Sequence, residues 1–363
     1  MSLAGAPDGA TLPPGRDVVF TGCEAPEAEF DPATASAEAL AAHGLPPRPD
    51  PQREPALSAH WRGMFVEEPI KFITAELTQN APLPRDDGFL QGNNFALGGG
   101  SARRLTARQL SRNWAGAVAG AHSGMRFNGI VGSWCVPTLG AASTEGEESL
   151  ISAWIGLGGA RRYDRSMPQM GSEHGWHADG NEVHRLWCQW WQGDHGEAML
   201  STIITNMPLQ PGDKLLFSLV LTAPDEVLCH VKNVTQGGLL TGVRGRSRRP
   251  AKASSAEWVV ERPAEVIAPL LFQGLPPADL PPLRRGRLMR RPEVGPIDFQ
   301  GAAALLSTPD RNRSRVVSLR DAELLALYEV SNKPTRLTVP IRPKLVEQDG
   351  STLLSIRGEA VQH

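Results

Sequence analysis

The nine residues VHRLWCQWW, at positions 183–191, decide the fold predicted for this chain. Side chains of a β-strand point alternately to its two faces, so every second residue belongs to the same face. In this stretch one face holds Val183, Arg185, Trp187, Gln189 and Trp191, and the other holds His184, Leu186, Cys188 and Trp190. Because both faces are mostly apolar, the stretch predicts a central strand of a sheet that is covered on both sides.

Further short apolar runs, each bounded by turn residues, also predict β-strands. Residues 214–221 come after Pro211-Gly212-Asp213, and a hairpin is expected about Ala223-Pro224-Asp225. Runs of this kind, broken by Gly, Pro or Asp roughly every ten residues, are typical of an antiparallel β-sandwich. The predicted fold class is therefore all-β. Residues 318–328 fit either a short helix or a pair of strands with a loop.

The stretch AEWVVE, at positions 256–261, predicts a strand with two carboxylates on one face. Glu257, Val259 and Glu261 alternate with an apolar set on the opposite face, made of Ala256, Trp258 and Val260. Either carboxylate is therefore a candidate for general acid and base chemistry.

The N-terminal third differs in composition from the rest. Residues 1–60 are rich in Pro and Ala with few large apolar side chains, which predicts a tail or a pro-segment without a core of its own. Residues 61–112 are interpreted as a linker or as further pro-segment, with a hinge at Gly98-Gly99-Gly100-Ser101. The folded domain is expected over residues 113–363.

Composition excludes several classes of protein. The chain has 363 residues, with 37 Lys and Arg against 39 Asp and Glu, and this balance does not favour nucleic acid or an anionic membrane as a partner. No apolar run reaches the length of about 18 residues that a membrane helix needs. A monomer is expected. The first 30 residues lack the pattern of a secretory signal, which leaves the compartment open.

The common catalytic and metal motifs are missing from the sequence. No nucleophile elbow, P-loop, HExxH or dinucleotide motif occurs, and the four cysteines, Cys23, Cys135, Cys188 and Cys229, have no metal-binding spacing. The stretch Glu173-His174-Gly175-Trp176-His177, with His184 and His195 nearby, matches no compact metal template. No metal and no cofactor are therefore expected.

A series of short motifs is more specific than any one of them. In chain order they are Asn113-Trp114-Ala115-Gly116-Ala117, Gly132-Ser133-Trp134-Cys135-Val136-Pro137, Ser152-Ala153-Trp154-Ile155-Gly156-Leu157-Gly158-Gly159, Pro168-Gln169-Met170-Gly171, Trp187-Cys188-Gln189-Trp190-Trp191, Pro211-Gly212-Asp213 and Ala256-Glu257-Trp258-Val259-Val260-Glu261. The series resembles the glutamic peptidases, or eqolisins, of family G1, over roughly residues 113–356. This resemblance implies a lectin-like, concanavalin-like sandwich of two antiparallel sheets, preceded here by an irregular N-terminal arm.

The resemblance also implies an activity and a site. It implies a secreted acid endopeptidase, insensitive to pepstatin, that hydrolyses polypeptides with a glutamine and glutamate dyad. The family's glutamine falls on Gln169 and its glutamate on Glu261. A carboxylate can take a proton from water and return it to the leaving amine, while an amide N–H can stabilise the oxyanion. The tryptophans that contact substrate would be Trp114 and Trp154, and the substrate site is expected to include Trp187, Gln189 and Trp191 as well.

Two positions depart from the family pattern, and they keep a second function open. Gln189 and Gly158 stand where family members usually carry an acid. The alternative is a non-catalytic β-sandwich that binds peptide or glycan in the same groove. In strong acid the 37 Lys and Arg and the 9 His would carry about +46, which would strain the fold by self-repulsion. A pH optimum near 4 to 5, milder than in family members, is therefore expected.

Overall fold

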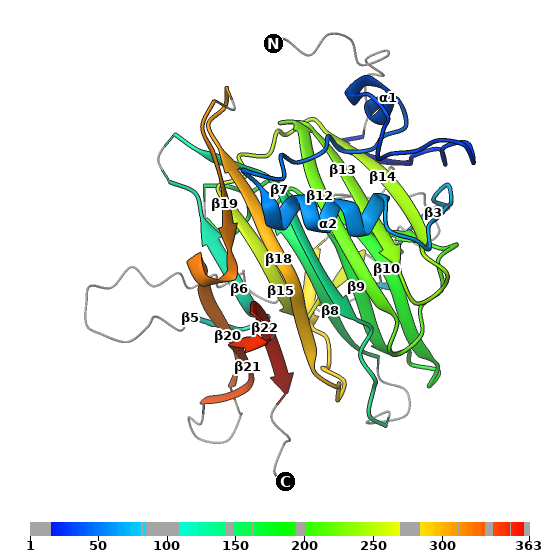
Figure 1. Cartoon of the computed structure of the whole chain (residues 1–363). Helices are drawn as coiled ribbons and strands as arrows, with labels where there is room; N and C mark the ends of the chain where they lie inside the picture. Colours follow the sequence, from blue (N-terminus) through cyan, green and yellow to red (C-terminus); the bar gives the residue numbers. More distant parts are fainter. Residues whose placement is uncertain are drawn as a thin grey trace.

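Most of the chain consists of β-strands in two large antiparallel sheets that pack face to face (Figure 1). The structure is a computed structural model, and it describes residues 16–80, 83–84, 109–122, 124–141, 148–161, 163–193, 200–268, 284–310, 312–330, 337–348 and 350–358. This architecture confirms the predicted all-β sandwich. The expected hinge at 98–101 and the residues 1–15 lie outside the described part of the chain.

The first sheet has seven main strands. In spatial order they are β1 (Val18–Gly22), β14 (Leu239–Ser247), β13 (Glu226–Asn233), β12 (Lys214–Ala223), β7 (Arg126–Cys135), β18 (Ile297–Ser307) and β19 (Ser314–Ser318). A short strand, β2 (Lys71–Phe72), runs parallel to the beginning of β14. The hairpin predicted about residues 223–225 is confirmed, since β12 ends at Ala223 and β13 begins at Glu226.

The second sheet carries the predicted site residues. Its strands in spatial order are β3 (Leu77–Gln79), β11 (Thr202–Ile204), β10 (Glu182–Trp191), β9 (Met167–Trp176), β8 (Ser149–Leu157), β15 (Ser255–Glu261), β6 (Trp114–Gly120), β20 (Glu323–Val330), β21 (Leu337–Gln348) and β22 (Ser351–Gly358), with β5 (Gln109–Ser111) parallel to β20. β22 pairs with the beginning of β18, and this pairing joins the two sheets. Of the two structures considered for residues 318–328, neither holds in full. A 3-10 turn at Leu319–Asp321 leads into the single strand β20.

A small third sheet lies beside the end of β15. It consists of β17 (Arg284–Leu288), β16 (Ala264–Ala268) and β4 (Leu83–Pro84). β16 begins three residues after β15 ends, so it continues the strand that carries Glu257 and Glu261.

The main core fills the space between the two large sheets. Leu186, Cys188 and Trp190 of β10 point into it, as does the apolar set of β15. Within the first sheet, Trp134 of β7 stacks on Phe217 of the neighbouring β12, with ring centroids 3.9 Å apart. The opposite faces of β10 and β15 are also buried, in a smaller cluster that contains Trp114, Trp154, Trp187, Trp191 and Val259. Both faces of each predicted strand are therefore largely buried.

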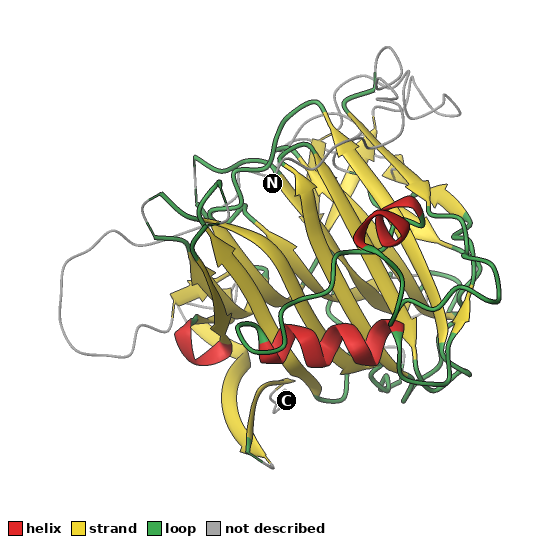
Figure 2. Ribbon diagram, turned by 45° about the horizontal axis from the view of Figure 1, so that its top comes forward, coloured by secondary structure: helices red, strands yellow, loops and turns green. Residues whose placement is uncertain are grey.

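The N-terminal segment packs against the outer face of the first sheet. The helices α1 (Ala37–Ala42) and α2 (Pro55–Phe65) cover this face, and α2 lies across its strands (Figures 1 and 2). Residues 1–60 were expected to build no core of their own, and their apolar side chains pack against the first sheet, in a cluster that includes Leu240 of β14. Leu40 and Leu57 are buried there, as are Trp61, Met64 and Phe65 just beyond. The apolar residues of α2 recur at helical spacing, which lets a few side chains form one continuous face.

The domain boundaries at 60 and 112 and the role of a pro-segment stay predictions. Among the described ranges no helix is long and apolar enough to cross a membrane.

Candidate active site

The outer face of the second sheet collects polar side chains from four adjacent strands. Strand register aligns Gln189 of β10, Gln169 of β9, Gly156 of β8 and Glu257 of β15 in one row. Gly156 has no side chain, and a Cβ added there would lie 3.2 Å from the Cβ of Gln169. The row therefore holds two amides and one carboxyl around a position without a side chain.

A second row lies four residues further along β8. It aligns Arg185 of β10, Glu173 of β9, Ser152 of β8 and Glu261 of β15. Trp154 and Trp187 lie in the row between the two. In a flat sheet this register would put the Cα atoms of Gln169 and Glu261 roughly 16 Å apart. A water that contacts both must therefore lie between two extended side chains.

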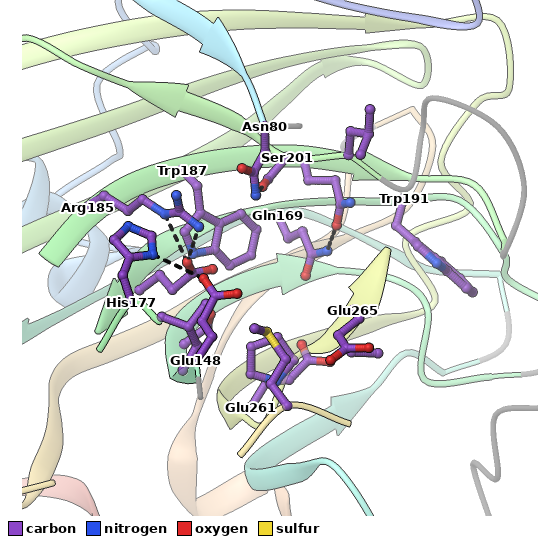
Figure 3. Close-up of a pocket in the computed structure, with 18 of the residues that line it drawn as sticks. Asn80, Glu148, Gln169, His177, Arg185, Trp187, Trp191, Ser201, Glu261 and Glu265 are labelled. Carbon is purple, nitrogen blue, oxygen red and sulfur yellow. Dashed lines mark hydrogen bonds and ion pairs between the residues drawn. The ribbon is translucent and has the colours of Figure 1, made fainter. Parts of the chain in front are cut away.

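Gln169 and Gln189 of the first row and all four residues of the second row line a cavity with a volume of about 670 Å³ (Figure 3). Five of the seven residues predicted for the site line it, namely Gln169, Glu261, Trp187, Gln189 and Trp191. The other two, Trp114 and Trp154, are buried and are not among the described residues that line the cavity. They pack edge to face with ring centroids 5.0 Å apart, so their contact with a substrate stays a prediction.

The carboxyl group of Glu261 is held by two side-chain donors. Its Oε1 accepts a hydrogen bond from Nδ2 of Asn113 at 3.0 Å, and its Oε2 accepts one from Nε1 of Trp154 at 3.0 Å. Trp154 is in turn braced by Trp114. Trp154, held in place by Trp114, therefore helps to fix the orientation of the Glu261 carboxyl group.

The side-chain amide of Gln169 is oriented by its neighbour in the same row. Its Nε2 donates to Oε1 of Gln189 at 2.6 Å. Its Oε1 is buried and accepts no hydrogen bond from the described residues. A primary amide carries two N–H groups, so the bond to Gln189 engages one donor of Gln169 and fixes the plane of the amide.

Two buried carboxyl groups lie beyond Gln169, at the other end of the β15 face. Glu257 is fully buried, and its oxygens accept no hydrogen bond that meets normal geometry from the described residues. Burial raises the pKa of Glu257 well above its ordinary value, the nearby Ser255 hydroxyl opposes this shift, and the Asp164 carboxylate adds to it. Asp164 lies beside Gly158: a Cβ added to Gly158 would be 2.9 Å from Oδ2 of Asp164.

The sequence analysis marked Glu257 through strand alternation but missed Asp164. No periodic pattern marks the loop that carries Asp164. The acid expected at Gly158 is missing from that position, but a carboxylate from the loop occupies the adjacent space.

The opposite end of the cavity holds an ion pair and a contact between a histidine and a carboxyl group, neither of which any sequence pattern predicted. Nε of Arg185 donates to Glu173 at 2.8 Å, and Nδ1 of His177 lies 3.1 Å from Oε1 of Glu148 (Figure 3). Glu173 and His177 belong to the stretch considered for metal binding. Strand alternation splits that stretch, so that Glu173 lines the cavity while His174 is buried beside Ser172.

His174 of that stretch contacts His184 of the neighbouring strand β10. Nδ1 of His174 and Nδ1 of His184 are 2.8 Å apart, and Nε2 of His184 is 2.8 Å from Glu182. His195 lies outside the described residues. Within the described ranges no group of three His, Cys, Asp or Glu side chains could hold a metal ion.

Comparison with solved structures finds glutamic peptidases. Scytalido-glutamic peptidase with a transition state analog inhibitor is 17% identical, with a TM-score of 0.49, and the match covers 68% of this chain and 98% of that chain. SCP-B, a member of the Eqolisin family in complex with a tripeptide, gives 17% identity, 68% and 98% coverage and a TM-score of 0.46. Aspergilloglutamic peptidase from Aspergillus niger gives 17% identity, 58% and 99% coverage and a TM-score of 0.34. No curated protein sequence matches the chain.

The fold and the cavity define a β-sandwich protein with a polar site on the outer face of one sheet. The sequence model of the Peptidase A4 family matches residues 112–339, which is more than half of the chain. The chain belongs to the peptidase A4 family, the eqolisins of family G1. The family predicted from the motif series is confirmed, and with it a proteolytic function.

Proposed function

We propose that the protein is an acid endopeptidase that cleaves peptide bonds with water activated by Glu261 and Gln169. The observation that carries the proposal is that these two side chains, 92 positions apart in sequence, line one cavity together with Trp187 and Trp191. A cavity with a few convergent polar groups and aromatic walls is suited to an extended polypeptide.

Glu261 acts as general base and then as general acid. Its carboxylate takes a proton from the attacking water and later returns that proton to the leaving amine. The donors Asn113 and Trp154 keep the carboxyl group in one orientation, which lowers the cost of positioning it for each step.

Gln169 stabilises the oxyanion that forms when water adds to the peptide carbonyl. The N–H that is not directed at Gln189 donates to the developing negative charge. An amide does not titrate, so this donor is present at every pH at which Glu261 works. Glutamine at 189 also matters, because it offers an oxygen that accepts from Gln169 without adding a negative charge beside the oxyanion.

The proposal is tested by the hydrolysis of an unfolded protein substrate from about pH 2 to about pH 7, with and without pepstatin. We expect pepstatin-insensitive cleavage with an optimum near pH 4 to 5 and no cleavage by the Glu261→Gln variant. The thermal midpoint of this variant should stay close to that of the parent, because the shape of the side chain is kept.

Near-normal turnover in purified Glu261→Gln would remove Glu261 as the catalytic carboxylate. Peptide or glycan binding without cleavage at any pH would favour the non-catalytic alternative.

A further inference from the structure

The N-terminal segment reaches the cavity at its β11 side. β3 pairs with β11 at the edge of the second sheet, and the backbone N–H of Asn80 donates to the carbonyl of Ser201 at 2.8 Å. Asn80 and Ser201 both line the cavity (Figure 3). The pairing of β3 with β11 therefore ends at the cavity wall.

The same segment pairs again on the other side of the cavity. β4 runs parallel to β16, with Leu83 opposite Ile267 and Pro84 opposite Ala268. β16 begins at Ala264, which also lines the cavity. Only three positions separate Asn80 from Leu83, a span of at most about 11 Å. One edge of β16 thus lies next to the cavity, and its backbone pairs there with an extended chain.

The sequence of β4 limits the number of main-chain hydrogen bonds that it can donate to β16. Pro82 and Pro84 flank Leu83, and proline has no backbone N–H. Proline is tolerated in an edge strand where its nitrogen faces away from the neighbouring strand, so Leu83 is the residue of β4 that directs its backbone groups at β16. β4 therefore offers β16 one backbone donor, and a longer extended chain without proline at the paired positions would offer more.

We propose that this edge of β16 is the binding site for the backbone of the polypeptide substrate on the C-terminal side of the scissile bond, and that β4 occupies it in competition with substrate. The inference rests on the proposed function for the identity of its ligand. The ligand class is an extended polypeptide without proline at the paired positions, added to the sheet by main-chain hydrogen bonds.

The parallel direction of β4 fixes the polarity of the bound substrate. β16 runs away from the cavity, from Ala264 towards Ala268, and a chain parallel to it runs the same way. Residues over Gln169 and Glu261 therefore precede the residues that lie along β16. The scissile bond lies over the cavity, and the residues that follow it pair with the strand.

Binding is measured on the full chain with Glu261→Gln, so that the peptide stays intact, with its integrity checked by mass spectrometry. The probe is a fluorescent, proline-free peptide of about ten residues, followed by anisotropy. A set of peptides carries one backbone N-methyl group at each successive position. We expect N-methylation to weaken binding about fivefold at alternate positions on the C-terminal side, since each methyl group removes one main-chain donor.

Two variants of the occupying segment sharpen the test. Leu83→Pro removes the remaining donor of β4 and should tighten peptide binding about fivefold. Leu83→Ala keeps the backbone N–H and should change the affinity less than about twofold. Melting curves of both variants show whether the fold is kept.

The proposal is overturned if no position on the C-terminal side responds to N-methylation, or if Leu83→Pro and Leu83→Ala bind the peptide alike. Hydrolysis by the parent chain is measured separately and locates the scissile bond. Absence of hydrolysis with an intact N-methyl pattern would reject the peptidase activity but keep the strand-addition site. Hydrolysis without that pattern would do the reverse.

Discussion

The outer faces of the two sheets differ in what covers them. On the first sheet α2 closes the face, with Met64 and Phe65 fully buried, and Nζ of Lys232 donates to the carbonyls of Gly63 and Glu67. On the second sheet the face stays open as a cavity lined by carboxyl, amide and indole groups. The same sandwich thus places its helical cover on one side and its candidate chemistry on the other.

The difference shows in the state of the buried titratable groups. Burial lowers the pKa of His60 and of His230, each to about 4, so the closed face holds both imidazoles neutral at neutral pH. The open face keeps Glu261 between two fixed donors at the edge of the cavity. We infer that acid acts in opposite ways on the two faces. It weakens the cover on the first sheet, while under the proposed function it favours hydrolysis at the site on the second sheet.

The largest effect we expect is the loss of the closed face in acid. The folded-state pKa values of His60 and His230 lie below the ordinary value of 6.5, so the unfolded chain binds protons first as the pH falls. The contribution of the two neutral imidazoles to the free energy of unfolding is therefore fully present above about pH 6.5. It is lost as the pH falls to about 4, by about 3 kcal/mol for each histidine. Urea unfolding at the two pH values measures the drop.

A matched pair of variants assigns this drop. The double variant His60→Gln, His230→Gln should lose much less stability between pH 7 and pH 4 than the parent, whereas His122→Gln, which alters an exposed histidine, should behave like the parent. An unchanged drop in the double variant would place the acid sensitivity elsewhere and break the comparison.

The next largest effect concerns packing under α2. Phe65 is fully buried and meets His230 edge to face at 5.1 Å, so Phe65→Ala should destabilise the fold by about 3 to 5 kcal/mol. Denaturant unfolding measures the loss, and turnover per folded molecule should stay unchanged because the site lies on the other sheet. A fall in turnover without a fall in stability would show that the two faces are coupled.

A smaller effect tests the open face. Gln169→Ala should lower kcat/KM about 100-fold, the cost of one oxyanion donor, or about 2.7 kcal/mol of transition-state free energy. The melting temperature should change little, since the side chain lies at the cavity wall. Gln52→Ala, an exposed glutamine on the N-terminal segment, serves as the control. Equal kcat/KM in the two variants would remove Gln169 from the mechanism.

Strand alternation predicted much of the second sheet from sequence. The faces assigned to residues 183–191 and 256–261 are those that the structure shows, because a period of two leaves no freedom once a strand is buried on both sides. The motif series then located Gln169 and Glu261, which strand pairing brings to one cavity from distant positions.

The cover on the first sheet could not be predicted from composition. Pro and Ala dominate the composition of residues 1–60. The boundary drawn at residue 60 also separates Leu57 from Trp61, Met64 and Phe65, which belong to the same helix. Asp164 and the pair formed by Glu148 and His177 were missed for a different reason. They meet other residues only through folding, and no local spacing marks them.

The smallest effect separates the two carboxylates of β15. The folded-state pKa of Glu257 is raised above its ordinary value, so its contribution to stability is complete at low pH and is lost as the pH rises towards that raised pKa. Gln does not titrate, so Glu257→Gln should gain stability relative to the parent as the pH rises from acid to neutral, measured by urea unfolding. Hydrolysis should persist in this variant and vanish in Glu261→Gln. The reverse outcome would move the catalytic carboxylate into the row of Gln169, where strand register places Glu257 across Gly156. The two measurements together therefore decide whether Glu261 or Glu257 of β15 is the catalytic carboxylate, and which of the two only destabilises the fold as a buried acid.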